Sequence, residues 1–250
     1  MRILAVDVGN TMIDLGLFED DRLVGFRTVS THSVNECKDF KKVLTFFSSD
    51  LAIVASVVPQ FTPFVLEMLE VNEKYLFDHR FPMSLKLSYK NPEELGPDRI
   101  ANSLYVFHNF KKNSIILDFG TAITVDVVTR EGIHLGGAIL PGVDLSLNSL
   151  YRSTARIKET TLDIPSSFLG KSTKECLEVG IMRGIEGTVR HIIKNIKREL
   201  GWRRALIVAT GGSFFKIREL FPDFIFEPYI TLKGLVTALF LTVKKESQYD

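Results

Sequence analysis

The chain carries the same short pattern at two places, and this repeat constrains its fold more than any other feature. Both segments are apolar and end in Asp, any residue and Gly, and they read VDVGNT over Val6–Thr11 and LDFGTA over Leu117–Ala122. An apolar strand that ends this way runs into a tight turn, because glycine tolerates backbone conformations that other residues avoid. The repeat predicts two related halves whose phosphate-sized turns could face one another across a cleft.

The residues after each copy predict the same order of strands. We expect strands over 2–8, 12–18 and 22–29, and again over 114–119, 122–129 and 132–139, so that each copy opens an antiparallel three-strand meander. Helices are expected over 33–47, 63–70, 97–110, 143–152, 172–200 and 231–243, with short buried strands over 51–55, 205–209 and 224–226. The pattern favours an α/β fold with halves at 1–110 and 111–250, each a mixed sheet flanked by helices.

Composition excludes several classes of protein. The 250 residues are 45% hydrophobic and 24% charged, which is ordinary for a globular protein. A net charge of +1 and a pI near 7.8 supply no basic face for nucleic acid. No run of apolar residues approaches the roughly 20 that a membrane span needs, and the N-terminal strand is too short for a signal-peptide core. We therefore expect a cytoplasmic protein with no nucleic-acid or membrane partner.

The two cysteines, Cys37 and Cys176, are far apart in the sequence and have no metal-ligand spacing around them. This pattern argues against a zinc site and against a disulfide framework, so a reducing compartment is expected. Both side chains are predicted to be small buried apolar groups.

The repeated turns have the chemistry of phosphate contacts. Backbone N–H groups around a turn glycine are unshielded, and the side chains of Asn10, Thr11 and Thr121 can donate further hydrogen bonds to phosphate oxygens. Asp7 and Asp118 end their strands where a carboxylate could hold a metal ion. The segment Ala209–Gly212 follows another buried strand and is a candidate contact for the nucleoside. A single Asp-x-Gly turn more often only closes a hairpin, but two copies with the same strand order favour nucleotide binding.

A second candidate phosphate site is rejected. Residues 165–172 read PSSFLGKS and resemble a P-loop, G-x-x-x-x-G-K-[ST], but Pro165 takes the place of the first glycine and no strong strand precedes it. No G-x-G-x-x-G fingerprint follows any expected strand. Phosphate binding is therefore expected from a different architecture.

The motifs together resemble those of type III pantothenate kinase, in the acetate kinase, sugar kinase, Hsp70 and actin superfamily. The resemblance runs from residue 3 to about residue 240, and its motifs are DVGNT (7–11), SVVP (56–59), GPDR (96–99), DFGTAITVD (118–126), GGAILPG (136–142) and TGG (210–212). It implies two actin-like (ribonuclease H-like) halves. It also implies transfer of the ATP γ-phosphoryl group to the primary hydroxyl of pantothenate, the first step of coenzyme A biosynthesis.

The same resemblance implies roles for individual residues. ATP would be bound by Asp7, Val8, Gly9, Asn10, Thr11, Met12, Ile13, Asp14 and Thr121, and pantothenate by Tyr89, Gly96, Pro97, Asp98, Arg99 and Thr173. Asp98 would be the catalytic base, and Arg99 would meet the substrate carboxylate. Asp7 would lie on the Mg²⁺ side of the nucleotide, and Asp118 would bind a monovalent cation, K⁺ or NH₄⁺. The family also implies a homodimer.

Physical chemistry supports these roles to different degrees. Phosphoryl transfer depends on positioning and charge neutralisation, which two phosphate turns and Mg²⁺ would supply. A helix that starts at Pro97 places Asp98 and Arg99 at an anion-friendly N-terminus, although GPDR without the resemblance would more often be only an ordinary helix start with a surface arginine. Two residues depart from the family pattern. Ile123 replaces a usual threonine and is expected to face inward, and Pro97 replaces a common alanine and should stiffen the loop.

Two other functions stay open from the sequence. The chain could be a non-catalytic regulatory factor of the same fold, but Asp7, Asp98 and Asp118 are all present. It could also be a kinase of another small hydroxylated substrate, such as a sugar, or of polyphosphate. Sugar kinases of this superfamily are generally longer and lack the Gly-x-Asp-Arg element.

Overall fold

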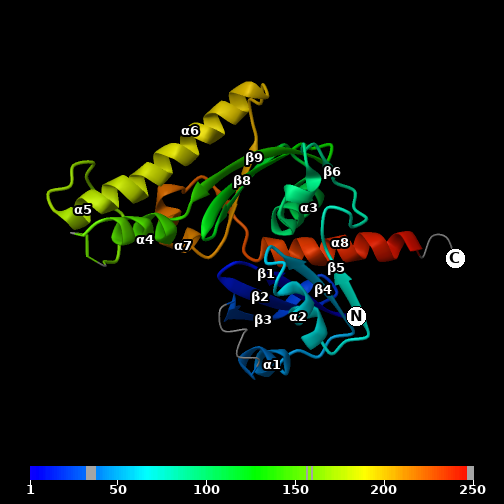
Figure 1. Ribbon diagram of the computed structural model, residues 1–250. Coiled ribbons are helices and arrows are strands. Elements are labelled where there is room, and N and C mark those ends of the chain that lie inside the picture. Colours follow the sequence, from blue (N-terminus) through cyan, green and yellow to red (C-terminus); the bar gives the residue numbers. More distant parts are fainter. Residues whose placement is uncertain (32–37, 156, 159, 247–250) are drawn as a thin grey trace. The chain divides into compact units, whose positions relative to one another are not determined.

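The computed structural model describes residues 1–31, 38–155, 157–158 and 160–246, and the chain folds into two compact units (Figure 1). The first unit contains Met1–Lys111, Val127–Gly136 and Tyr229–Asp250, and the second contains Lys112–Asp126 and Gly137–Pro228. Each unit therefore includes segments that are distant in the sequence.

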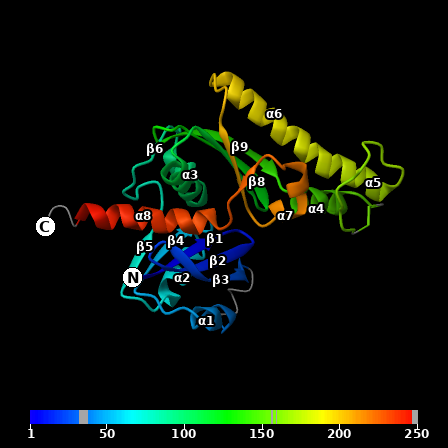
Figure 2. The same cartoon turned by 180° about the vertical axis from the view of Figure 1, so that it is seen from behind.

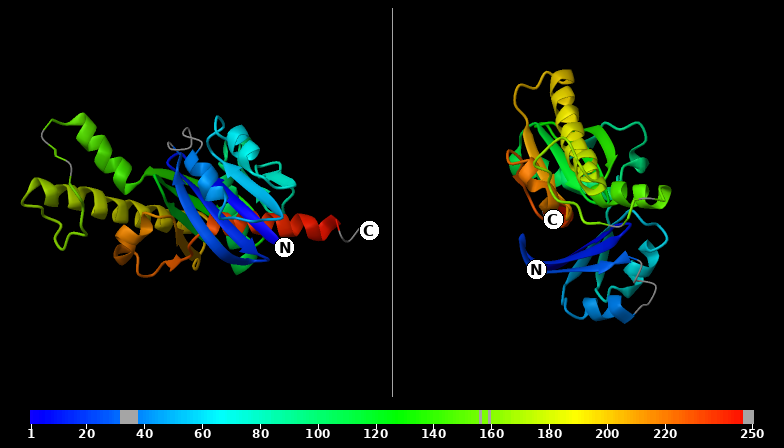
Figure 3. Two further views of the ribbon diagram at one scale, coloured as in Figure 1. Left: turned by 90° about the horizontal axis from the view of Figure 1, so that it is seen from below. Right: turned by 90° about the vertical axis from the view of Figure 1, so that its left-hand side faces the viewer.

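A five-stranded sheet, in the order β3-β2-β1-β4-β5, forms the centre of the first unit. Its strands are β1 (Arg2–Val8), β2 (Met12–Glu19), β3 (Arg22–Ser30), β4 (Leu51–Ser56) and β5 (Glu73–Leu76). The first three are antiparallel neighbours, and they lie side by side in blue in Figure 3. Strands β4 and β5 join in parallel. The predicted opening meander is confirmed.

Helices cover both faces of this sheet because its strands are apolar on both sides. On one face, α1 (Lys38–Leu44) and α2 (Thr62–Met68) contribute Phe40 and Val65 to a core that includes Leu4, Val6 and Val8. On the other face, α8 (Ile230–Glu246) packs against β1, β2, β4 and α3 (Pro97–Phe110). Figures 1 and 2 show α8 in red between α3 and these strands. Residues 33–37 of the helix expected over 33–47 lie outside the described residues.

Close backbone approach explains two glycines of this packing. A Cβ on Gly234 of α8 would overlap the backbone of Ala101 in α3, so glycine allows the two helices to touch. A Cβ on Gly16 of β2 would lie 2.9 Å from a methyl carbon of Leu232 in α8. The face of β2 that carries Gly16 is therefore the face that α8 covers.

The second sheet has six strands in the order β11-β10-β7-β8-β9-β6. They are β6 (Lys86–Leu87), β7 (Ser114–Phe119), β8 (Ala122–Val128), β9 (Ile133–Pro141), β10 (Leu206–Thr210) and β11 (Ile225–Phe226). Strands β7, β8 and β9 are consecutive neighbours, as the repeat predicts, and β10 adds in parallel to β7. Ile115, Leu117 and Phe119 of β7 lie in one buried core of the second unit.

Helices α4 (Val143–Ser153), α5 (Thr173–Glu178), α6 (Gly184–Glu199) and α7 (Phe214–Ile217) contribute side chains to that core. The long helix expected over 172–200 is confirmed, because Thr173–Glu199 is helical throughout, with one π-helical turn, η3 (Val179–Arg183), between α5 and α6. Gly180 lies within this turn and Gly184 follows it, and both weaken the α-helical preference there.

The prediction of a buried Cys176 is also wrong. Cys176 is exposed on α5, and its thiol lies 3.5 Å from the carbonyl oxygen of Gly170. Because α5 is a short surface helix, its apolar positions do not all face the core. Cys37 lies outside the described residues. Within the described part of the chain, no helix is long and apolar enough to cross a membrane.

Candidate functional site

The first predicted phosphate turn joins β1 to β2, and each of these two strands carries one aspartate beside the turn. Asp7 of β1 lies directly opposite Asp14 of β2 in the antiparallel register. Ala5 and Gly16 form the pair two residues back, and Gly16 meets α8. Because side chains alternate along a strand, Asp7 and Asp14 share the face that carries α8 and α3, whereas Val6 and Val8 point into the opposite core.

Asp14 has an electrostatic environment that its position in the hairpin explains. Burial raises the pKa of the Asp14 carboxyl above its ordinary value, and a hydrogen bond with the side chain of Thr28 partly opposes this shift. Thr28 of β3 is the residue opposite Asp14, so Asp7, Asp14 and Thr28 form a row across three strands. A bound cation or a hydrogen-bond donor would stabilise the charged form of this buried carboxylate.

Thr31, which was not selected from the sequence, fixes the shape of this turn. The Gly9 amide donates to the Met12 carbonyl at 2.9 Å, and the Thr31 amide donates to the Thr11 carbonyl at 2.9 Å. The Thr31 hydroxyl also donates to the Gly9 carbonyl at 2.7 Å, and the residue is only 1% exposed. Three hydrogen bonds thus hold Gly9–Met12, while the Asn10 and Thr11 residues remain exposed.

The predicted substrate motif lies beside a turn that is bonded to this hairpin. The amide of Val57, in the turn after β4, donates to the carbonyl of Val8 at 3.0 Å. A Cβ on Gly96 would lie 3.5 Å from the Val57 side chain, and it would collide with the Asp98 carboxylate. Glycine at position 96 therefore lets Asp98 fold back over the first turn of α3, close to the turn that follows β4. The motifs DVGNT, SVVP and GPDR form one cluster in the first unit.

The remaining first-unit predictions are placed around α3 and β9. Pro97 is at the first helical position, as expected, and Arg99 is buried with 6% exposure. Tyr89 is half-buried, and its ring lies 6.2 Å from the ring of His134 on β9, a residue with no exposed surface. Gly136 has φ +105°, and a Cβ there would lie 3.9 Å from Tyr89. His134 was not selected from the sequence.

In the second unit, glycines of two distant segments, Gly142 and Gly211, meet the second predicted phosphate turn. The Gly120 amide closes it by donating to the Ala122 carbonyl at 3.1 Å, and the Gly142 amide donates to the Thr121 carbonyl at 3.0 Å. A Cβ on Gly142 would lie 2.5 Å from that same oxygen. The motif GGAILPG thus ends against the DFGT turn, and Thr121 stays exposed.

The TGG motif packs on the Asp118 side chain. Thr210 is paired in parallel with Asp118, and the Ser213 amide donates to the Phe119 carbonyl at 2.9 Å. Gly211 has φ +93°, and a Cβ there would lie 2.5 Å from an Asp118 carboxylate oxygen. Ile123 is 1% exposed within the core, so the prediction of an inward apolar side chain is confirmed.

The residues at both turns suit cations of different kinds. Mg²⁺ in phosphoryl transfer needs only one or two carboxylates beside phosphate and water, and Asp7 faces Asp14. The Asp118 carboxylate lies in a turn cluster whose Gly120 and Thr121 carbonyl oxygens approach Gly142, and such oxygens suit an alkali cation. In the part of the chain that the structure describes, no three His, Cys, Asp or Glu side chains gather into a metal-binding group.

Thr173 belongs to the second unit and is exposed at the start of α5. Its helix is capped by the Ser172 hydroxyl, which accepts from the Glu175 amide at 3.2 Å, and the Glu175 carboxylate accepts from the Lys171 amide at 2.6 Å. This capping box gives GKST a structural role. Between α4 and α5 no strand occurs among the described residues, which supports rejecting residues 165–172 as a P-loop.

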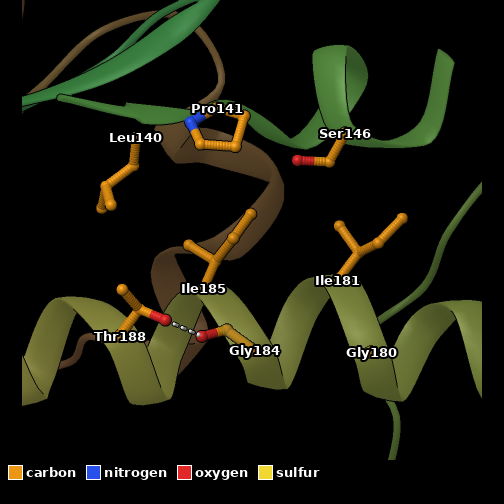
Figure 4. Close-up of a pocket in the computed structure, with 8 residues that line it drawn as sticks. All are labelled: Leu140, Pro141, Ser146, Gly180, Ile181, Gly184, Ile185 and Thr188. Atoms are coloured by element: carbon orange, nitrogen blue, oxygen red, sulfur yellow. Dashed lines mark hydrogen bonds between the residues drawn. The ribbon is translucent and has the colours of Figure 1, made fainter. Parts of the chain in front are cut away.

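A separate cavity of about 250 Å³ lies between the end of β9 and the junction of η3 with α6 (Figure 4). None of its lining side chains is charged; they are Leu140, Pro141, Ser146, Gly180, Ile181, Gly184, Ile185 and Thr188. The Thr188 hydroxyl donates to the Gly184 carbonyl at 2.8 Å and is already occupied. With no charged side chain in its lining, and Ser146 as the other hydroxyl there, this cavity offers little to neutralise a phosphate.

Sequence comparison gives this geometry a family. Residues 3–195 match the family model described as type III pantothenate kinase. The chain belongs to the type III pantothenate kinase family. A type III pantothenate kinase from Roseiflexus sp. (strain RS-1) is 35% identical over 253 residues, covering 93% of this chain and 96% of its own. A type III pantothenate kinase from Moorella thermoacetica is 32% identical with the same coverages.

Solved structures agree on the fold of this pantothenate kinase family member. A Campylobacter jejuni protein described as a Baf family transcriptional activator has a TM-score of 0.67 at 19% identity, covering 96% of this chain and 99% of its own. The activator of 2-hydroxyisocaproyl-CoA dehydratase from Clostridium difficile has a TM-score of 0.58 at 14% identity, covering 100% and 97%. The actin-like α/β class expected from the sequence is confirmed.

Proposed function

We propose that this protein is an ATP-dependent pantothenate kinase that transfers the γ-phosphoryl group to the primary hydroxyl of pantothenate. The product, 4'-phosphopantothenate, is the first intermediate toward coenzyme A. Membership of the family supports this proposal. The observation that carries it is the first-unit cluster, in which the GPDR helix start lies beside Val57, whose amide is bonded to Val8 of the phosphate hairpin.

We assign the reacting groups as follows from this cluster. The Asp98 carboxylate accepts the proton of the primary hydroxyl while the hydroxyl oxygen forms a bond to the γ-phosphorus. The bond from that phosphorus to the bridging oxygen breaks, and ADP leaves. Pro97 and Gly96 hold Asp98 at the start of α3, where the helix N-terminus also favours an anionic substrate group. Arg99 and Tyr89 orient pantothenate, and Thr173 is assigned a further contact.

Cations are assigned to the two strand ends that carry aspartate. Asp7 would hold Mg²⁺, which would supply charge neutralisation at the phosphate oxygens. Asp118 would hold K⁺ or NH₄⁺, and the residues from Asp7 to Asp14, together with Thr121, would bind ATP. The row of Asp7, Asp14 and Thr28 and the crowding of Gly211 against Asp118 support separate roles for the two sites.

An ADP-release assay with pantothenate, ATP, Mg²⁺ and K⁺ tests the proposal. Loss of a general base typically lowers turnover by about 10²–10⁴-fold, so Asp98→Asn should reduce kcat in that range with an unchanged unfolding midpoint. Glu93→Gln removes a neighbouring exposed carboxylate and should leave kcat unchanged. Replacing K⁺ by Na⁺ should lower the rate, and Asp118→Asn should abolish this difference. Full turnover by Asp98→Asn would contradict its role as base.

Assays on the same purified protein distinguish two alternative functions. A non-catalytic regulatory factor would bind ATP without turnover; one structural neighbour is described as a Baf family transcriptional activator. A kinase of another substrate would turn over with a sugar but not with pantothenate. Thermal shift with pantothenate against sugars distinguishes them, since a ligand at 100 times its Kd stabilises a fold by roughly 3 kcal/mol.

We further propose that the protein is a cytoplasmic homodimer. Several large apolar side chains of the second unit are exposed, with Ile139 at 63%, Phe168 at 74% and Leu169 at 79%, and such surfaces are typical of association sites. A monomeric mass in sedimentation experiments at micromolar concentration would contradict the dimer. We also propose that the repeat divides the sequence into two halves, 1–110 and 111–250.

A further inference from the structure

A second cavity in the second unit has a charged wall and an apolar floor, and none of the assigned roles uses it. Its volume is about 290 Å³, near the lower limit for small-molecule sites. Three basic residues of α6 line it, Arg190, Lys194 and Lys197, and they recur at the spacing that places side chains on one helical face. The other lining residues are Ile193, Ile207, Asp223 and Phe224.

Arg190 forms a fixed part of this wall. Its guanidinium donates to the Leu220 carbonyl at 2.5 Å and pairs with Glu186 at 3.3 Å and with Asp223 at 3.4 Å. It also lies 5.4 Å from the ring centre of Phe221. These contacts compensate the charge of Arg190 and that of Asp223, the one acidic residue in the lining.

Lys194 and Lys197 differ from Arg190 because their charges are not compensated. Neither has an ion pair or side-chain hydrogen bond among the described residues. Lys197 is in the last turn of α6, where the helix dipole favours a cation, but that effect explains neither Lys194 nor the apolar floor beneath both. Two uncompensated ammonium groups at i,i+3 on α6, both lining this cavity, therefore attract a doubly charged anion.

The floor adds a requirement for apolar surface on the same ligand. Ile193 and Phe224 each keep 9% of their surface exposed, and Ile207 is half-buried. An aromatic ring or short alkyl group that covers them would remove this surface from water. Lysine acts as a point-charge phosphate ligand, whereas carboxylates match the fork of arginine, whose bonds are already made here.

We propose that this cavity binds a small phosphate monoester with an apolar body. The phosphate lies between Lys194 and Lys197, and the apolar group lies on Ile207 and Phe224. This site belongs to α6, β10 and the segment before β11, and it is separate from the turns at Asp118 and Thr121. It would give the protein a second phosphorylated ligand whose binding does not depend on the proposed kinase activity.

Titration of the full chain with phenyl phosphate tests this site directly. With ¹³C-methyl labelled isoleucine, the resonances of Ile193 and Ile207 should shift and saturate with a dissociation constant of about 1 mM, as expected for a ligand with so few atoms. Inorganic phosphate and phenol should each bind about tenfold more weakly, because each retains only one of the two interactions. If inorganic phosphate or phenol bound as tightly as phenyl phosphate and shifted the same resonances, the proposal would be overturned.

Variants distinguish specific recognition of phenyl phosphate at this cavity from a general effect of the protein's positive charge. The double change Lys194→Gln and Lys197→Gln should weaken phenyl phosphate binding about tenfold, and the change of both lysines to Arg should largely retain it. Lys41→Gln with Lys42→Gln removes the same charge from exposed residues of α1 in the other unit and should have no effect. Unchanged affinity in the Lys194 and Lys197 double variant, with an unchanged unfolding midpoint, would also overturn the proposal.

Discussion

The two Asp-x-Gly turns have the same local sequence pattern but are held in different ways. The turn after Asp7 is fixed by one residue, Thr31, through its buried hydroxyl and its amide. The turn after Asp118 is fixed by glycines from two distant segments, Gly142 and Gly211. In both, the apolar neighbours of the aspartate enter a core, while the alternation of the strand directs the carboxylate to the opposite face.

This difference underlies the separate roles that we propose for the two turns. The first turn carries two carboxylates in register, Asp7 and Asp14, and exposed donors at Asn10 and Thr11, as a nucleotide-metal site needs. At the second turn one carboxylate, that of Asp118, is crowded by backbone, in keeping with the monovalent-cation role that we propose for it. Substitutions can perturb the two turns separately.

The largest effect is expected at the second turn. Gly211→Ala adds a Cβ at φ +93° that would lie 2.5 Å from the Asp118 carboxylate, so it should lower the free energy of unfolding by about 2–4 kcal/mol. The K⁺ concentration for half-maximal activity should also rise, because Asp118 must move. Urea unfolding and K⁺ titration measure these changes.

Gly212→Ala is the matched control, since no atom lies within 4 Å of a Cβ at that position. It should change stability by less than about 0.5 kcal/mol. Equal loss in both variants would mean that crowding at Asp118 does not determine the geometry of this turn.

A smaller effect is expected at the first turn. Thr31→Val keeps the shape of the side chain but removes the hydrogen bond to the Gly9 carbonyl, which should cost about 1 kcal/mol and raise the KM for ATP. Thr45→Val removes a bond of the same type, from the hydroxyl to the Lys42 carbonyl at 2.7 Å, at an exposed position, and should change neither quantity. An unchanged KM in Thr31→Val would show that the turn keeps its shape without this contact.

The smallest effect concerns ionisation of the hairpin. Because burial raises the pKa of Asp14, its charged form opposes folding above that pKa, and lowering the pH removes the opposition. Asp14→Asn should therefore raise the unfolding midpoint at pH 7, and the gain should disappear as the pH falls toward about 4. Thermal unfolding of both proteins across this range measures it. A gain that stays constant with pH would assign the effect to something other than ionisation.

The sequence predicted more of the local structure than of the site. The meanders and the helix from Pro97 followed from apolar alternation and from proline at a first turn, and both are confirmed. Thr31, Thr28 and His134 were missed because each acts across strands or through a hydroxyl and leaves no spacing pattern. The long helix over 172–200 was also predicted, but not its π-helical turn η3, because helical periodicity continues on both sides of one such turn.

By itself the sequence determined the two strand–turn units, their glycines and their carboxylates, because these depend on residues close together in the chain. Only the tertiary structure decided what surrounds them. It places α8, the last helix, against β1 and α3 in the first unit, on the face shared by Asp7 and Asp14. It also brings Gly142 and Gly211 onto one turn, since close backbone approach depends on packing between distant segments rather than on local preference.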